Sequence, residues 1–166
     1  MATHRMPILG WASQPNSSNV FFQSYDVVAT NDVWDRMVLT FNDTATRDGI
    51  AGGFTVPKSY VAAPVIVVVW TAVPTSGNVV WDFDYRAVGG NDTESLDQTS
   101  NQESITVTDA APTSAHRRLE ATMAMTAGNM AVDDEVEFEL FRDGTAADTM
   151  AGAAHVFAVL FEWSDA

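Results

Sequence analysis

The stretch NVVWDFDYRAV, residues 78–88, decides the fold class of this 166-residue chain. In an extended strand the aromatic side chains of WDFDYR (81–86) share one face, and its two aspartates and its arginine share the other. An apolar face that fills a core and a charged face that meets water are typical of a half-solvated antiparallel sheet. The pattern therefore predicts one strand of a structural β-sandwich.

Two carboxylates on one strand face also raise a catalytic alternative. Asp82 and Asp84 would lie roughly 7 Å apart in a strand, a spacing that a glycosidase pair can use. A general acid needs a raised pKa, however, and Arg86 on the same face favours the ionised form of both groups. We therefore predict no catalytic residue and a protein that is not an enzyme.

Alternating runs separated by turn residues continue along the chain, and no segment shows a convincing helical period. The run 64–72 is continuous and β-branched, as expected for a central strand. Segment 116–130 holds good helix formers, but its strict alternation and the turn residues at 128–129 favour a strand. The glycine pair at 52–53 indicates a bulge or a close backbone approach.

The number of alternating runs defines the architecture that we expect. Nine runs are candidate strands: 20–28, 34–41, 50–56, 64–72, 78–88, 104–109, 116–127, 134–143 and 154–163. Their count and spacing are typical of an all-β sandwich or barrel. The polar stretch 91–103 is a predicted surface loop. We predict a single jelly-roll-like antiparallel β-sandwich over residues 20–166.

The charge balance excludes several classes of partner. The chain has 22 acidic and 8 basic residues, a net charge of −14, so nucleic acid and anionic membrane surfaces would repel it.

The longest apolar run, 65–70, is too short to span a bilayer. The N-terminus lacks the long apolar core of a signal peptide. The chain contains no cysteine, which excludes disulfides and cysteine-based metal or redox sites.

Metal and cofactor sites have weak candidates only. Asp92, Glu94 and Asp97 cluster in the polar loop, and three consecutive acids stand at 133–135, but neither group has the spacing of an EF-hand loop. The three histidines stand singly, without partners at metal-ligating spacing. We predict no cofactor and no metal-binding residue, with calcium between loops as an open alternative.

The five tryptophans allow a carbohydrate-binding alternative. Tryptophan rings on a sandwich face can form a stacking platform for sugars. Most of these rings fall on predicted core faces, and Trp11 and Trp34 are the exceptions. A carbohydrate-binding β-sandwich module is therefore the alternative function from a different class.

Residues 1–19 form a predicted extended N-terminal arm, with a frayed tail or an unrecognised first strand as the alternatives. The arm is polar and rich in turn residues, yet it carries a short apolar group: Met6, Pro7, Ile8, Leu9 and Trp11. These side chains gain nothing from exposure to water on a flexible segment. We therefore predict that all five contact a neighbouring subunit.

The C-terminal segment FELFRDGTAADTMAGAAHVFAVLFEW (138–163) resembles the ending of small jelly-roll proteins of tailed phages and archaeal tailed viruses. There a strand ends in Arg-Asp, an Ala/Asp/Thr loop follows, and a last strand closes the domain. VPKSYVAAPVIVVVW (56–70), followed by WDFDYRAVGG, is similar in kind, and together these segments cover about half of the chain. The family has no catalytic residues to transfer.

This resemblance implies a virion structural protein. Its expected role is capsid decoration, in which a cement protein stabilises the shell through subunit contacts, or else that of a tail or fibre component. The expected partners are copies of the same chain, with a trimer favoured, and other virion proteins such as the major capsid protein. The expected location is the virion, after assembly in the host cytoplasm.

The net charge of −14 also predicts a response to salt. Because the chain has one lysine and many aspartates, its composition suits either a salt-rich habitat or a GC-rich genome. Self-repulsion should weaken as the Debye length shrinks from about 30 Å at about 0.01 M salt to about 3 Å at about 1 M. We expect the melting temperature to rise between these NaCl concentrations; a flat or falling trend would contradict the prediction.

Overall fold

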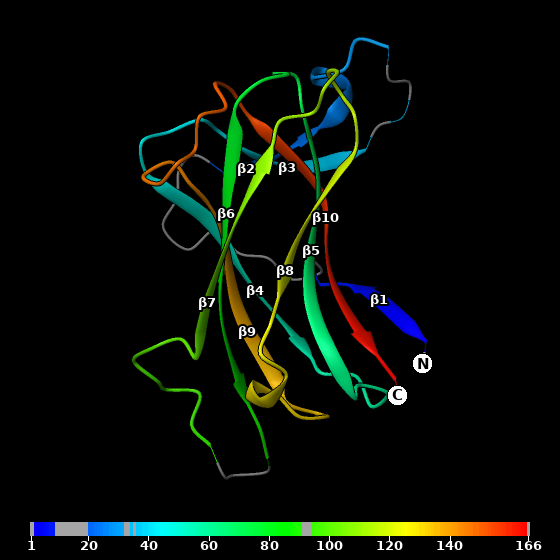
Figure 1. Ribbon diagram of the computed structural model, residues 1–166, viewed down its shortest axis with the longest axis vertical. Helices are drawn as coiled ribbons and strands as arrows, with labels where there is room; N and C mark the ends of the chain where they lie inside the picture. Colours follow the sequence, from blue (N-terminus) through cyan, green and yellow to red (C-terminus); the bar gives the residue numbers. More distant parts are fainter. Residues whose placement is uncertain (1, 9–19, 32–33, 35, 91–93, 166) are drawn as a thin grey trace.

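The computed structural model describes residues 2–8, 20–31, 34, 36–90 and 94–165, and these form two antiparallel sheets packed face to face (Figure 1). Ten strands and two single-turn 3-10 helices, η1 (Tyr25–Val27) and η2 (Ala127–Asn129), lie in these ranges. The predicted all-β, jelly-roll-like sandwich is therefore confirmed. No helix in these ranges is long and apolar enough to cross a membrane.

Each sheet contains strands from distant parts of the chain. The six-stranded sheet has the order β2–β3–β10–β5–β8, with β1 also paired to β10: β2 (Val20–Ser24), β3 (Met37–Phe41), β10 (Ala154–Ser164), β5 (Ala62–Ala72), β8 (Leu119–Ala124) and β1 (Thr3–Pro7). The four-stranded sheet has the order β4–β9–β6–β7: β4 (Arg47–Thr55), β9 (Glu135–Asp143), β6 (Asn78–Val88) and β7 (Glu103–Ala110).

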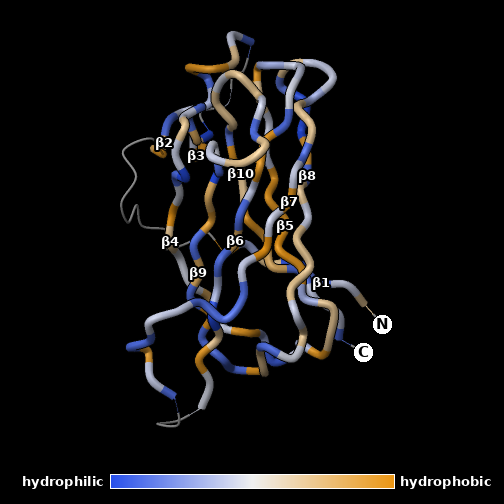
Figure 2. Tube along the Cα trace, turned by 60° about the vertical axis from the view of Figure 1, so that its left-hand side comes forward, coloured by the Kyte–Doolittle hydropathy of each residue, from blue (hydrophilic) through white to orange (hydrophobic). Residues whose placement is uncertain are grey.

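The core lies between the sheets and is built on tryptophan. Trp81 of β6 and Trp70 of β5 are fully buried, with ring centroids 5.8 Å apart in an edge-on arrangement. Phe41 of β3 packs edge-on against Trp81 at 5.2 Å. Figure 2 shows hydrophobic and hydrophilic segments alternating along the strands, as the sequence predicts for sheets with one buried face.

Most predicted runs became strands. The run 78–88 coincides with β6, and its aromatic residues at 81, 83 and 85 are buried as predicted. Segment 116–130 contains the strand β8 and no α-helix, so the strand prediction is confirmed. The register between β4 and β9 passes through Gly52 and Gly53 without a bulge. The close approach is real, because a Cβ on Gly52 would lie 2.6 Å from the Phe138 ring.

The segment predicted as an arm contributes a strand to the sandwich. Residues Thr3–Pro7 pair antiparallel with the end of β10, so Met6 lies opposite Phe161. Ile8 is only 3% exposed and belongs to the chain's own core. Contact of Met6, Pro7 and Ile8 with another subunit stays a prediction. Leu9 and Trp11, which share that prediction, lie outside the described residues.

A buried arginine joins the two sheets at one end. Arg142, near the end of β9, is 2% exposed. Its Nε donates to Asp148 Oδ2 at 2.8 Å, and its Nη2 donates to Asp148 Oδ1 at 2.9 Å. The same guanidinium donates to the carbonyl oxygens of Met150, Gly152 and Phe41. It therefore fixes the connection between β9 and β10 against β3.

Removing the Asp148 carboxylate should leave the Arg142 charge buried without its partner. We expect Asp148→Ala to lower the free energy of unfolding by about 3–5 kcal/mol in urea titration. Asp43→Ala is the matched control, because Asp43 lies 3.6 Å from the same guanidinium and its side chain is 48% exposed. That change should cost under about 1 kcal/mol. Equal losses in both variants would contradict this account.

Candidate functional site

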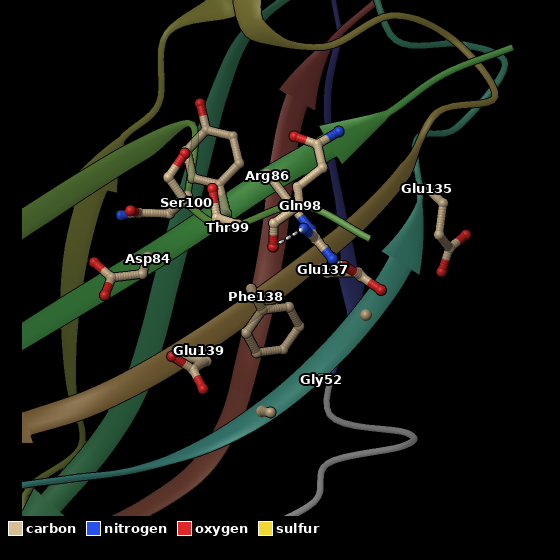
Figure 3. Close-up of a pocket in the computed structure, with 14 residues that line it drawn as sticks. Gly52, Asp84, Arg86, Gln98, Thr99, Ser100, Glu135, Glu137, Phe138 and Glu139 are labelled. Carbon is tan, nitrogen blue, oxygen red and sulfur yellow. Dashed lines mark hydrogen bonds and ion pairs between the residues drawn. The ribbon is translucent and has the colours of Figure 1, made fainter. Parts of the chain in front are cut away.

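The outer face of the four-stranded sheet carries a groove of about 780 Å³ (Figure 3). Strands β4, β9 and β6 form its floor, and the connection between β6 and β7 forms one wall. The residues that line the groove are Ala51, Gly52, Gly53, Asp84, Tyr85, Arg86, Gln98, Thr99, Ser100, Asn101, Glu135, Glu137, Phe138 and Glu139. Most of them are polar, so the groove is suited to a polar ligand.

The hollow arises because β4 carries small residues on its outer face. Ile50 and Phe54 point into the core, so the alternation of the strand turns Ala51 and Gly53 outward. Because neither residue has more than a methyl group as its side chain, the outer surface of this edge strand is low here. The neighbouring strand β9 places longer acidic side chains beside them, which produces the trough.

Arg86 holds the wall of the groove in place. Its Nε donates to Glu137 Oε2 at 2.6 Å, across the pair β6–β9. Its two other nitrogens donate to the carbonyl oxygens of Gln98 at 3.2 Å and of Leu96, as Figure 3 shows for Gln98. The arginine therefore neutralises Glu137 and fixes the polar loop beside the sheet.

Arg47, rather than Arg86, binds the two aspartates of WDFDYR. Arg47 Nε donates to Asp82 Oδ2 at 2.9 Å, and Nη2 donates to Asp84 Oδ2 at 2.8 Å. Thr106 Oγ1 also donates to Asp82, at 2.6 Å. Asp82 is 7% exposed, so the prediction that its face simply meets water is wrong at this residue. A partner from another part of the chain covers it.

Asp84 and Glu139 form a pair of adjacent carboxylates on the groove floor. They are direct partners in the register of β6 and β9. Asp84 Oδ1 is buried, and no hydrogen-bond partner for it is found among the described residues. The Glu139 carboxylate also accepts no hydrogen bond from the part of the chain that the structure describes. Glu139 therefore retains unused acceptor capacity, whereas Asp84 Oδ1 is closed to solvent and Asp84 Oδ2 binds Arg47.

Tyr85 lies beneath the groove, and its hydroxyl group is engaged in hydrogen bonds within the protein. Its hydroxyl donates to Glu103, which also accepts hydrogen bonds from the backbone and side chain of Thr126. Asn129 Nδ2 donates to the Tyr85 hydroxyl at 3.3 Å. Burial and the bond to Glu103 raise the pKa of Tyr85 far above its usual range. The phenol is therefore unsuited to proton transfer near neutral pH.

The structure brings two of the singly spaced histidines together on the outer face of the other sheet. His116 and His155 flank Tyr25, each with a ring centroid 5.9 Å from the tyrosine ring. Tyr25 Oη lies 2.8 Å from His116 Nδ1, and Thr40 Oγ1 lies 3.1 Å from His155 Nδ1. Burial, helped by repulsion from His116, lowers the pKa of His155 to about 4.

The acidic residues considered as calcium ligands do not form a metal site among the described residues, and two of them accept hydrogen bonds from backbone N–H groups. Among the described residues, no group of three or more His, Asp or Glu side chains is placed to hold a metal ion. Glu94 accepts a hydrogen bond from the Gly89 N–H at 2.7 Å, and Asp134 accepts one from the Ala131 N–H at 2.7 Å. Asp92 lies outside the described residues.

The described tryptophans follow the prediction that most of them lie in the core. Trp70, Trp81 and Trp163 are buried in the core. Trp34 is 76% exposed, near the β2–β3 end of the six-stranded sheet and outside the groove. Trp11 lies outside the described residues. No tryptophan lines the groove in the described part of the chain.

Comparison with known proteins relates the chain to carbohydrate-binding folds. No known family profile and no curated protein matches it. A family 35 carbohydrate-binding module from Clostridium thermocellum matches with a TM-score of 0.51 and 9% identity, over 99% of both chains. An arabinose-bound α-L-arabinofuranosidase matches with a TM-score of 0.52 and 11% identity, over 95% of this chain but only 24% of the enzyme. Identities this low show a shared fold and nothing about ligands.

These matches correct the predicted function. One structure that matches this chain along its full length is a carbohydrate-binding module. The predicted resemblance to virion proteins of tailed viruses is therefore wrong. So is the prediction of a capsid decoration, tail or fibre protein that forms a trimer and binds the major capsid protein. The alternative, a carbohydrate-binding β-sandwich module, fits the fold better.

The buried His155 should make stability depend on pH. The unfolded chain binds a proton at His155 below about pH 6.5, whereas the folded chain binds it only below about pH 4. The free energy of unfolding should therefore fall as the pH drops through this window, by up to about 3 kcal/mol from this group.

The variant His155→Gln isolates that contribution. We expect a flatter dependence of unfolding free energy on pH between about 6.5 and 4 than in the unmodified chain. His4→Gln is the control, because the His4 side chain is 39% exposed and pairs with Asp165 at the surface. An unchanged slope in His155→Gln would refute the assignment, since the acidic residues would then account for the whole effect.

Proposed function

We propose that this chain is a non-catalytic carbohydrate-binding module, and that an oligosaccharide lies in the groove on the outer face of the four-stranded sheet. The observation that carries the proposal is the trough itself: a low floor of Ala51, Gly52 and Gly53 beside a row of hydrogen-bonding side chains. Its volume of about 780 Å³ is within the range of small-molecule sites, about 300–1,000 Å³.

The chemistry of the lining matches that of a sugar. Sugar hydroxyls donate and accept hydrogen bonds, and carboxylates accept them strongly. Glu139 offers acceptor oxygens on the floor. The loop wall adds groups that can both donate and accept: Gln98, Thr99, Ser100 and Asn101. The small floor residues leave room for the flat C–H face of a pyranose ring.

The arrangement favours binding over hydrolysis. A glycosidase places its two carboxyl groups on either side of the scissile bond. Asp84 and Glu139 lie side by side on one floor, as direct register partners. Asp82 is occupied by Arg47 and Thr106. The fold shared with a family 35 carbohydrate-binding module supports the same conclusion.

Filling the trough tests the proposed function. Ala51→Leu adds three carbon atoms to the floor and should abolish oligosaccharide binding, measured by isothermal titration calorimetry after a screen on a glycan array. Ala110→Leu is the matched control, because Ala110 is an exposed residue on the outer face of β7 in the same sheet and does not line the groove. Its affinity should stay unchanged. Absence of any glycan ligand, or equal binding by both variants, would refute the proposal.

A further inference from the structure

Part of the connection between β6 and β7 stands off from the sheet, and in Figure 1 it extends away from the strands. Every residue from 94 to 102 is exposed, and none of them belongs to a strand or a helix. We call residues 94–102 the strap. The strap contributes no buried apolar side chain, and segments of this kind have low local stability. Its position beside the groove therefore depends on hydrogen bonds.

Hydrogen bonds fix the strap at its two ends. The Glu94 carboxylate accepts from the Gly89 N–H at 2.7 Å. At the other end the Gln102 N–H donates to the Tyr85 carbonyl oxygen at 2.8 Å, and Gln102 Oε1 accepts from the Ala87 N–H at 3.1 Å. Both ends of the strap are therefore attached at the end of β6, and the segment between them spans the distance with its own backbone.

Arg86 fastens the middle of the strap. Its Nη1 donates to the Gln98 carbonyl oxygen at 3.2 Å, and its Nη2 donates to that of Leu96. In the described part of the chain, no other residue outside the strap forms a hydrogen bond with residues 95–100. Glu137 accepts from Arg86 Nε at 2.6 Å and so orients the guanidinium from the floor of the groove. One side chain therefore links the floor to the strap.

Empty space beside the strap leaves it room to move. A second hollow of about 320 Å³ lies between the strap and the end of β6, where Arg86 and Ala87 line it together with strap residues. The groove and this hollow share Arg86 and three strap residues, Gln98, Ser100 and Asn101. A strap that moved would therefore change the shape of both hollows without displacing any side chain of the core.

We propose that the strap opens and closes beside the groove as a unit, and that Arg86 is the latch that holds it closed. The inference rests on the proposed function, because an open strap would admit the oligosaccharide. When the strap closes, it brings Gln98, Thr99, Ser100 and Asn101 against the ligand. Loops that close over ligands in this way move on the microsecond to millisecond timescale. Arg86 is thus a positioning residue, which acts on affinity through the strap.

A guanidinium has the geometry that such a latch requires. It is planar and has five N–H donors in fixed directions, so one side chain reaches the Glu137 carboxylate and two carbonyl groups. A lysine is a point charge on a flexible stem. Arg86→Lys would keep a positive charge near Glu137 but could not hold all three acceptors at once. Arg86→Gln would remove the charge as well, so the two variants should release the strap to different degrees.

Spin labels measure the latch in the free protein. The chain has no cysteine, so Asp97→Cys in the strap and Thr108→Cys on β7 supply the only two labelled positions. Both residues are exposed, and neither lines the groove. Pulsed electron paramagnetic resonance should give one dominant distance between the labels. Arg86→Gln should raise the ratio of unlatched to latched distances at least about tenfold, and Arg86→Lys should raise it less.

Arg118→Gln is the matched control. Arg118 forms an ion pair with Glu120 beside the other sheet, far from the strap in the fold. Its removal should leave the label distances unchanged, and circular dichroism checks that each variant is folded. Arg86→Lys carries the test on its own if Arg86→Gln does not fold. Distances in the Arg86 variants that equal those of Arg118→Gln would overturn the inference.

Neutral hexasaccharides of β-1,4-linked glucose, xylose and galactose are the ligand probes, with the glycan array as the wider screen. Binding should remove the unlatched distances, and Arg86→Gln should weaken affinity about tenfold, chiefly through faster dissociation. A glycan that binds while the distances and the affinity of Arg86→Gln stay unchanged would overturn the inference and leave the proposed function standing. If no glycan binds, the proposed function fails, and the distances in the free protein still decide whether Arg86 fastens the strap.

Discussion

The packing of Trp81 between Phe41 and Trp70 is the constraint on which the rest of the structure depends. It joins β6 of one sheet to β3 and β5 of the other, with no exposed surface left on any of the three rings. Because side chains alternate along a strand, a tryptophan on the inner face at 81 forces residues 82 and 84 outward. The core thus determines that carboxylates stand on the outer face of the sheet, where the groove lies.

The scarcity of positive charge shapes how those carboxylates are stabilised. With 8 basic and 22 acidic residues, each buried or half-buried arginine serves several acceptors at once. Arg142 binds both oxygens of Asp148 and three carbonyl groups, and Arg47 spans Asp82 and Asp84. Arg86 combines Glu137 with the loop wall. Once these needs are met, little positive charge remains for the other carboxylates of the groove, such as Glu139.

The sequence predicts the features of this fold that depend on local alternation. It places the core aromatics of β6 correctly because period two alone decides which face they occupy. It misses β1 because the strand is short and its partner, β10, lies at the opposite end of the chain. The burial of Asp82 depends on Arg47, which no local pattern connects to it. The trough could be found only by knowing that the outward residues of β4 face long side chains of β9.

The misleading resemblance to virion proteins has a physical origin in the same long-range contacts. The Arg-Asp at 142–143 and the loop of small and acidic residues after it form the buried clamp of Arg142 on Asp148. A sandwich that must connect two strands of opposite sheets gains stability from such a clamp, whatever it binds. The pattern therefore reports how a strand connection is anchored and carries no information about partners. Function has to be read from the outer face, where side chains are left unsatisfied by the fold.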